Sequence, residues 1–186
     1  IKGKDEIKIT SKAKYFTPDI SPSGTKIIAV SVNDSLQSEL HVLDKTGMLL
    51  LNIPAPQGAI YVHPRFIDQH SAVVAMRMPD ASMGLYRINL EKKSIEQLTP
   101  LTKPTVGFTY VDKGMVYFTS SLAGTDDLYA LNLANKSVKQ ITSGGTGNYA
   151  PSVWNDTLTW AAFTSNGFRV QERALKEMTG VAITDA

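Results

Sequence analysis

The chain has 186 residues, of which 42% are hydrophobic and 19% charged, a composition typical of one globular domain with a sizeable core. Its formal net charge of +2 is too small to indicate a protein that binds nucleic acid or an anionic membrane. It contains no cysteine, which excludes disulfides, thiolate catalysis and cysteine–metal sites. No apolar run reaches the roughly 20 residues of a membrane-spanning helix, so we expect no membrane insertion. The chain opens with neither methionine nor a signal peptide, so we expect a mature or excised fragment.

The first well-marked element is the segment 16–30, which predicts a strand, a tight turn and a second strand. Ser21-Pro22-Ser23-Gly24 has the residue types of a turn, because proline presets φ and glycine tolerates positive φ. The run Ile27 to Val32 that follows is apolar at consecutive positions, which indicates a strand covered on both faces.

Weaker copies of this unit recur along the chain. Each copy ends in a short strand whose last aliphatic residue is usually followed by threonine, and these aliphatic residues are 44, 45, 43 and 42 residues apart. The five marks are Ile9-Thr10, Ile53-Pro54, Leu98-Thr99, Ile141-Thr142 and Ile183-Thr184. Such even spacing predicts a repeat architecture.

Three further strand-like runs lie between successive marks. The first often carries a proline, the second is the most apolar, and the third partly alternates; polar hairpin loops separate them. Four short antiparallel strands per repeat are typical of one β-propeller blade. We therefore expect an all-β protein, a single propeller domain over 1–186 with four four-stranded blades at 12–55, 56–100, 101–143 and 144–185.

The segment from Pro18 to Ile28 resembles the repeat of TolB-like β-propellers, whose pattern is roughly P-x-[WF]-S-P-D-G-K-x-I-[AV]. Ser23 stands where the pattern has aspartate, and Ile20 where it has an aromatic residue. The segment from Leu128 to Thr142 is similar to the family's closing pattern. The resemblance spans nearly the whole chain and implies propeller architecture, but such repeats serve as scaffolds, gates and docking surfaces alike.

Two arrangements of the blades remain open. If Val181–Thr184 is the fourth strand of the last blade, then residues 6–10 are the outer strand of a preceding blade, and the chain is an open arc of a larger ring. If the tail is not a strand, residues 6–10 could instead pair with 168–171 and close a four-bladed ring. We favour the open arc, because members of the family commonly have six or more blades.

The sequence offers little support for catalysis or metal binding. There is no G-x-S-x-G nucleophile motif, and Ser21 and Ser23 are explained by turn geometry. The three histidines are not spaced to converge on a metal, and Asp80 and Asp126-Asp127 lack D-x-D-x-D spacing, so we expect solvated loop acids. The glycine-rich segment 144–148 lacks the lysine of a phosphate loop and is interpreted as a flexible connection. We expect no catalytic residue, no metal and no cofactor.

Binding residues are expected on the first strands and inter-blade loops, which face the central channel and one rim of a propeller. Aromatic residues and arginine commonly anchor interfaces, although they can equally serve blade-to-blade packing. The candidates are Tyr15, Phe16, Asp19, Tyr61, His63, Arg65, Tyr149 and Trp154.

The sequence thus favours a non-catalytic module of an exported bacterial TolB-like protein, located in the periplasm or cell envelope or outside the cell. Its expected partner is a protein or peptide, besides other blades or domains of the parent chain, and not nucleic acid. Two alternatives remain: an accessory propeller of a larger peptidase whose catalytic residues lie outside these residues, and a sugar-binding or lyase propeller with a divalent metal in the channel.

Overall fold

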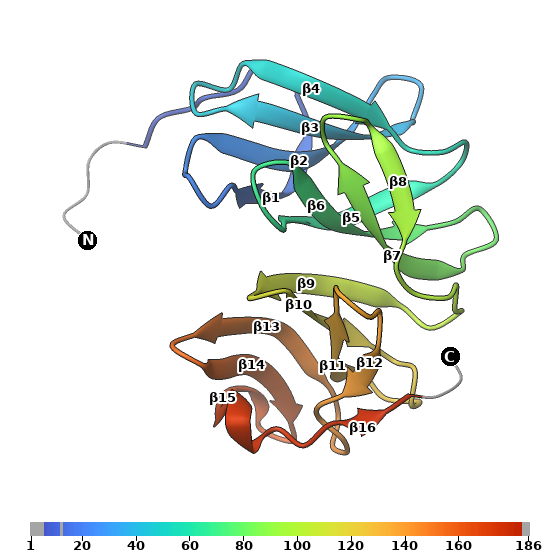
Figure 1. Cartoon of the computed structure of the whole chain (residues 1–186), viewed down its shortest axis with the longest axis vertical. Helices are drawn as coiled ribbons and strands as arrows, with labels where there is room; N and C mark the ends of the chain where they lie inside the picture. The colour runs from blue at the N-terminus through green and yellow to red at the C-terminus, as the bar shows by residue number, and fades with distance from the viewer. Residues whose placement is uncertain (1–5, 12, 184–186) are drawn as a thin grey trace.

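The computed structural model describes residues 6–11 and 13–183. Its strands form four antiparallel sheets that follow one another along the chain, as Figure 1 shows from the blue first sheet to the orange and red last one. The first strands of neighbouring sheets, β1 and β5, β5 and β9, and β9 and β13, pack side by side. We call these four the inner strands. The all-β class and the open arc of propeller blades are confirmed.

The first two blades are four-stranded, with their strands paired in sequence order. The first contains β1 (Tyr15–Ile20), β2 (Lys26–Val32), β3 (Ser38–Asp44) and β4 (Leu49–Pro54). The second contains β5 (Ile60–Phe66), β6 (Ser71–Arg77), β7 (Met83–Asn89) and β8 (Ser94–Gln97).

The last two blades depart from this plan, since one has five strands and the other three. The third contains β9 (Val106–Asp112), β10 (Met115–Ser120), β11 (Asp127–Asn132), β12 (Val138–Gln140) and, added from the end of the chain, β16 (Val181–Ala182). The fourth contains β13 (Asn148–Trp154), β14 (Thr157–Thr164) and β15 (Gly167–Ala174), and the 3-10 turn η1 (Leu175–Glu177) follows it.

The turn between β1 and β2 has the geometry that its residue types predict. Gly24 adopts a φ of 70°, and its N–H donates to the carbonyl of Ser21 at 2.8 Å. The Ser21 hydroxyl accepts the N–H of Lys26 at 3.0 Å and is buried. Ser21 is therefore a turn residue whose hydroxyl is committed to the backbone.

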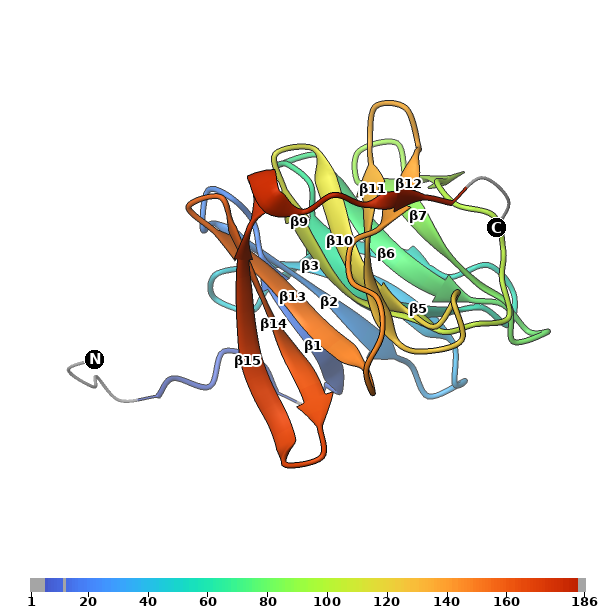
Figure 2. The same cartoon turned by 90° about the horizontal axis from the view of Figure 1, so that it is seen from below.

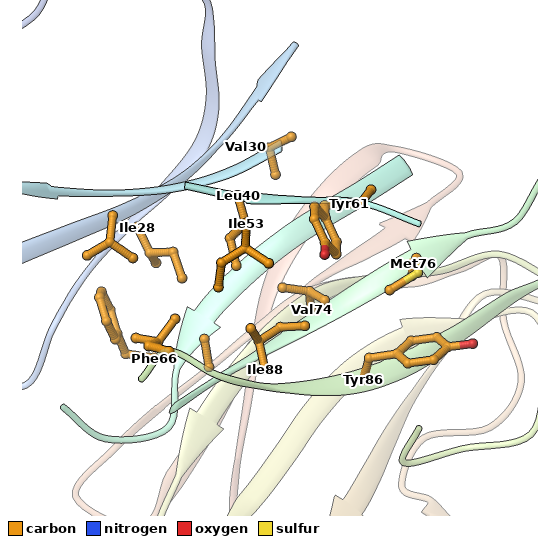
Figure 3. Packing of buried hydrophobic residues seen from close by; sticks show 14 of the residues in the cluster. Ile28, Val30, Leu40, Ile53, Tyr61, Phe66, Val74, Met76, Tyr86 and Ile88 are labelled. Carbon is orange, nitrogen blue, oxygen red and sulfur yellow. The ribbon is translucent and has the colours of Figure 1, made fainter. Parts of the chain in front are cut away.

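The hydrophobic core lies between the blades. Alternate residues of each strand point to opposite faces of a sheet, so a strand between two covered faces is apolar at consecutive positions, as the middle of β6 and the first four residues of β10 are. Three clusters fill the three interfaces between neighbouring blades. Figure 3 shows the first, where Ile28, Val30, Leu40 and Ile53 of the first blade meet Tyr61, Phe66, Val74, Met76, Tyr86 and Ile88 of the second.

The threonine of the repeat marker has a structural role. The Thr99 hydroxyl accepts the N–H of Leu85 at 2.9 Å, and the Thr142 hydroxyl accepts that of Leu128 at 2.8 Å. In each case the threonine after the outer strand accepts the backbone N–H of a fully buried leucine near the start of the third strand. The threonine of the marker thus anchors the end of the second and third blades to their own third strands.

The end of the chain corrects the expected fourth blade. Val181–Ala182 was expected beside β15 as the outer strand of the blade at 144–185, but β16 pairs with β12, opposite Lys139 and Gln140. Figure 2 shows β16 running beside β12 and away from β15. The physical reason is burial: Ile183 packs against the cluster between blades two and three, whereas Val170 on β15 is 84% exposed because no sheet of the described residues covers that face.

The start of the chain also differs from expectation. Residues 6–10 do not form a strand, so they are not an outer strand in the described structure, and they do not pair with 168–171 to close a four-bladed ring. They pass over the first blade instead, where the carbonyl of Ile9 lies so close to Gly47 that a Cβ there would be 1.8 Å away. Thr184 lies outside the described residues.

Within the described residues, the structure has no helix long and apolar enough to cross a membrane.

Candidate binding site on the inner strands

Every inner strand is interrupted by the same β-bulge. In each, two residues lie opposite one residue of the neighbouring strand, and the first of the two has positive φ. These residues are Thr17 (φ 47°), His63 (φ 47°), Phe108 (φ 48°) and Ala150 (φ 52°). Non-glycine residues in this region carry about 1–3 kcal/mol of strain, and bulges redirect side chains at functional sites. The four inner strands therefore share one strained backbone geometry at the same position of each blade, which makes these strands the first place to look for a site.

A cavity of about 290 Å³ lies beside the bulges of the second and third blades. Its lining comes from β5, β7, β9, β10, β13 and the adjoining loops, so it depends on three blades being in place. The residues that line it are Val62, His63, Met83, Thr105, Val106, Gly107, Phe108, Thr119, Asp126 and Tyr149.

His63 is held in this cavity by the backbone of the next blade. The N–H of Phe108 donates to His63 Nδ1 at 3.1 Å, so the neutral ring carries its proton on Nε2. A Cβ at Gly107 would lie 3.1 Å from His63 Nδ1, so the glycine gives the ring its place. Burial, with a smaller contribution from the charge of Arg65, lowers the pKa of His63 below its usual 6.5. The ring is therefore neutral at pH 7.

Tyr149, which lines the cavity from the fourth blade, is likewise fixed by a hydrogen bond and by a neighbouring glycine. Its hydroxyl donates to Asp126 Oδ2 at 2.8 Å, and this hydrogen bond, together with burial, raises the pKa of Tyr149. A Cβ at Gly147 would lie 2.5 Å from the Tyr149 hydroxyl oxygen, so only glycine permits this ring position. Gly107 and Gly147 thus leave the space that the rings of His63 and Tyr149 occupy in the cavity.

The rings continue into an aromatic row that crosses three blades. His63 stacks on Phe108 with ring centroids 4.8 Å apart, and Phe108 meets Tyr149 edge to face at 6.3 Å. Tyr149 contacts Phe168 at 6.0 Å, and Phe168 contacts Phe163 at 5.1 Å. Three of these rings, Phe108, Phe163 and Phe168, are exposed. An exposed aromatic row is characteristic of a surface that binds a partner.

Asp19 and Arg65 connect three inner strands. Arg65 Nε donates to the carbonyl of Thr109 at 2.9 Å, and its Nη1 donates to the carbonyl of Pro18 at 3.2 Å and lies 3.7 Å from Asp19. Asp19 in turn accepts the N–H of Phe66 at 2.8 Å. These two predicted site residues are brought together, but their polar atoms are engaged in holding neighbouring blades.

The other predicted residues lie elsewhere. Tyr61 is buried in the core between the first two blades and donates to the carbonyl of Pro54, which is the packing role weighed as its alternative. Tyr15 lies on the first blade, where its hydroxyl is 3.0 Å from His41 Nδ1. Phe16 is exposed just before the first bulge, and Trp154 is 78% exposed at the far end of β13 from Tyr149.

Several residues of the cavity escaped the sequence argument. Phe108 occupies the bulge position of the third blade, but Thr109 replaces the proline that marks the other three. The expectation that both acids of Asp126-Asp127 are solvated is wrong for Asp127, which is 1% exposed and accepts hydrogen bonds from four side chains. The donors are Thr125, Gln140, Thr142 and Asn148. Asp127 thus belongs to the interface between blades three and four, while Asp126 lines the cavity.

The described residues show no arrangement of side chains for metal binding or for nucleophilic catalysis. Among the described residues there is no group of three or more His, Asp or Glu side chains that could hold a metal ion. Nor does any serine or threonine hydroxyl in that part of the chain hydrogen-bond to a histidine ring, as a nucleophile and its base would. The cavity combines apolar walls with a few fixed polar groups, which is the usual make-up of a small recognition pocket.

No protein-family profile and no curated protein sequence matches the chain. Solved structures do match its fold. TolB from Acinetobacter baumannii superposes with a TM-score of 0.74 at 19% identity, over 93% of this chain and 44% of that one. A putative TolB from Agrobacterium tumefaciens gives 0.72 at 18% identity, over 93% and 66%. A puromycin-hydrolyzing peptidase from Mycobacterium tuberculosis gives 0.74 at 13% identity, over 95% and 29%.

These similarities concern the fold, since the identities are below 20%, and the chain spans less than two thirds of the length of each of these structures. Together with the four sheets and the repeated bulges of the inner strands, they establish that the chain has the fold of a TolB-like β-propeller.

Proposed function

We propose that this chain is a non-catalytic module that binds a protein or peptide along its inner strands, within an exported TolB-like propeller protein of the bacterial cell envelope. The observation that carries the proposal is the aromatic row from His63 to Phe163, exposed on blades whose bulges lie in register. Similar structures that include TolB proteins support the assignment at the level of the fold.

In this proposal the binding surface is rigid before the partner arrives. The blades are joined by three apolar clusters and by the Arg65 contacts, so the aromatic row needs little ordering when a partner arrives. A preformed surface avoids much of the entropic cost of association. Aromatic side chains add large contact areas with few rotatable bonds.

The test is a pull-down from bacterial envelope extract with the wild-type chain and two variants. Tyr149→Ala removes the centre of the aromatic row, whereas Trp154→Ala removes an exposed aromatic residue at the other end of the same strand. We expect a partner that wild type and Trp154→Ala retain and Tyr149→Ala loses. Recovery of no such partner, or equal recovery by both variants, would count against the proposal.

A second candidate function is that of an accessory propeller in a larger peptidase, which the similarity to a puromycin-hydrolyzing peptidase favours. The same blades would then gate or position a substrate for catalytic residues on another domain. The full open reading frame discriminates between the two: a downstream G-x-S-x-G or an upstream H-E-x-x-H would decide for the peptidase.

A further inference from the structure

The cavity beside the bulges has an asymmetric lining. Val62, Met83 and Val106 form an apolar part, and Phe108 closes it with an aromatic ring. Asp126 supplies a carboxylate, and among the described residues it forms no ion pair with a lysine or arginine. The cavity therefore has mostly apolar walls and one carboxylate group, that of Asp126.

The positive charges nearby do not neutralise this carboxylate. His63 lines the cavity but is neutral, because its Nδ1 accepts the N–H of Phe108 and burial lowers its pKa. Arg65 lies outside the lining, where Asp19 and two backbone carbonyls engage its guanidinium group. The charge of Asp126 remains available to a ligand.

Thr119 is a second polar residue in the wall of the cavity. This residue is only 5% exposed, lines the cavity, and its hydroxyl has no hydrogen-bond partner among the described residues. A buried hydroxyl without a partner costs about 1–3 kcal/mol, so folded proteins rarely retain one. The wall of the cavity therefore contains an unsatisfied polar group besides Asp126.

We propose that the cavity between the second, third and fourth blades binds a lysine side chain of the partner, with the ammonium group at Asp126 and the methylene stem along Val62, Met83 and Phe108. The inference rests on the proposed function and specifies the chemistry of the bound peptide. An alkylammonium group matches the lining at both ends, since its stem is apolar and its head donates three hydrogen bonds.

The experiment titrates isotope-labelled protein with Nα-acetyl-lysine amide and follows backbone amide shifts by NMR. The uncharged control probe is Nα-acetyl-norleucine amide, which has a similar stem without the ammonium group. We expect saturable shifts at Gly107, Phe108 and Tyr149 with the lysine probe and at least tenfold weaker binding of the norleucine probe. Equal binding of the two probes, or no saturable shift at these amides, would overturn the inference.

Two variants separate charge recognition from loss of structure. Asp126→Asn keeps an oxygen that can accept the Tyr149 hydroxyl, so it should fold normally and bind the lysine probe about tenfold more weakly. Thr119→Val removes the buried hydroxyl at nearly constant shape and should leave the protein at least as stable. Undiminished binding in Asp126→Asn would overturn the inference.

The two proposals fail separately. A Tyr149-dependent partner together with no lysine-probe binding would refute the cationic subsite and leave the binding module in place. Lysine-probe binding without any Tyr149-dependent partner would refute the binding module and leave an isolated cation pocket.

Discussion

The register of the repeat yields a direct test of the open arc. Leu40, Leu85 and Leu128 occupy equivalent positions on the third strands and are 0% exposed, whereas Val170, at the same position of the fourth blade, is 84% exposed. The first three face a following blade, whereas β15 faces none in the part of the chain that the structure describes. Replacing one of the three leucines by alanine should therefore lower the free energy of unfolding much more than replacing Val170 by alanine.

The magnitude follows from burial. Leu128→Ala removes a fully buried side chain from the core between blades three and four, which should lower the free energy of unfolding by about 3 kcal/mol. Val170→Ala changes an exposed residue, so its effect should stay within about 0.5 kcal/mol. With a slope of about 2 kcal/mol per molar urea, the midpoints should shift by about 1.5 M and less than about 0.3 M.

The assay is urea unfolding followed by circular dichroism, with matched slopes confirming that the same surface is exposed in each variant. If Leu128→Ala fails to fold, Leu128→Val provides a milder deletion in the same place. A cost above about 1.5 kcal/mol for Val170→Ala would show that the outer face of β15 is covered in solution, and would refute the arrangement of the last blade.

Three further predictions concern polar and glycine positions of the inner side. Asp127→Ala should lower the free energy of unfolding by about 3 kcal/mol or more, measured in urea, because four donors lose their buried acceptor; a cost below about 1 kcal/mol would contradict this network. His63 should titrate by NMR with a pKa below its usual 6.5. Because the unfolded chain then binds the proton more tightly than the folded chain, the contribution of His63 to the free energy of unfolding should be complete above pH 6.5 and should fall as the pH drops toward the folded-state pKa. If the stability of a His63→Gln variant had the same pH dependence as that of the wild type, this prediction would be refuted. Gly147→Ala should shift the Tyr149 ring resonances and destabilise the chain by about 1–2 kcal/mol, because φ is +137° and a Cβ would meet the tyrosine hydroxyl; unchanged resonances and stability would exclude this packing.

Much of the fold could be predicted because a propeller repeats its local chemistry. Apolar second strands, turn residues such as those around Gly24, and the threonine marker each reflect one requirement of a blade, and four copies make the signal strong. The outer strand of the fourth blade was misplaced for a physical reason. Val170 and Ile183 have the same 13-residue separation as Leu128 and Ile141, but this register does not reveal which face will be covered.

The candidate site was only partly accessible from the sequence. His63 and Tyr149 were identified because they are aromatic residues near repeated prolines, whereas Phe108 lacks the proline that marks its register. Asp126 reaches the cavity from a hairpin loop of a different strand pair, and the lack of a hydrogen-bond partner for the Thr119 hydroxyl depends on packing across blades. Such convergence of distant segments is set by tertiary structure and leaves no local pattern.

The most direct test of binding along the inner strands is site-specific photo-crosslinking in envelope extract. A photoreactive amino acid in place of Phe108, at the bulge of the third blade, is compared with the same amino acid in place of Trp154, which is more exposed (78% against 44%) but lies outside the lining of the cavity. We predict that mass spectrometry recovers one partner segment cross-linked at position 108 and none at position 154. Cross-links at position 154 alone, or at both positions equally, would contradict a binding site on the inner strands.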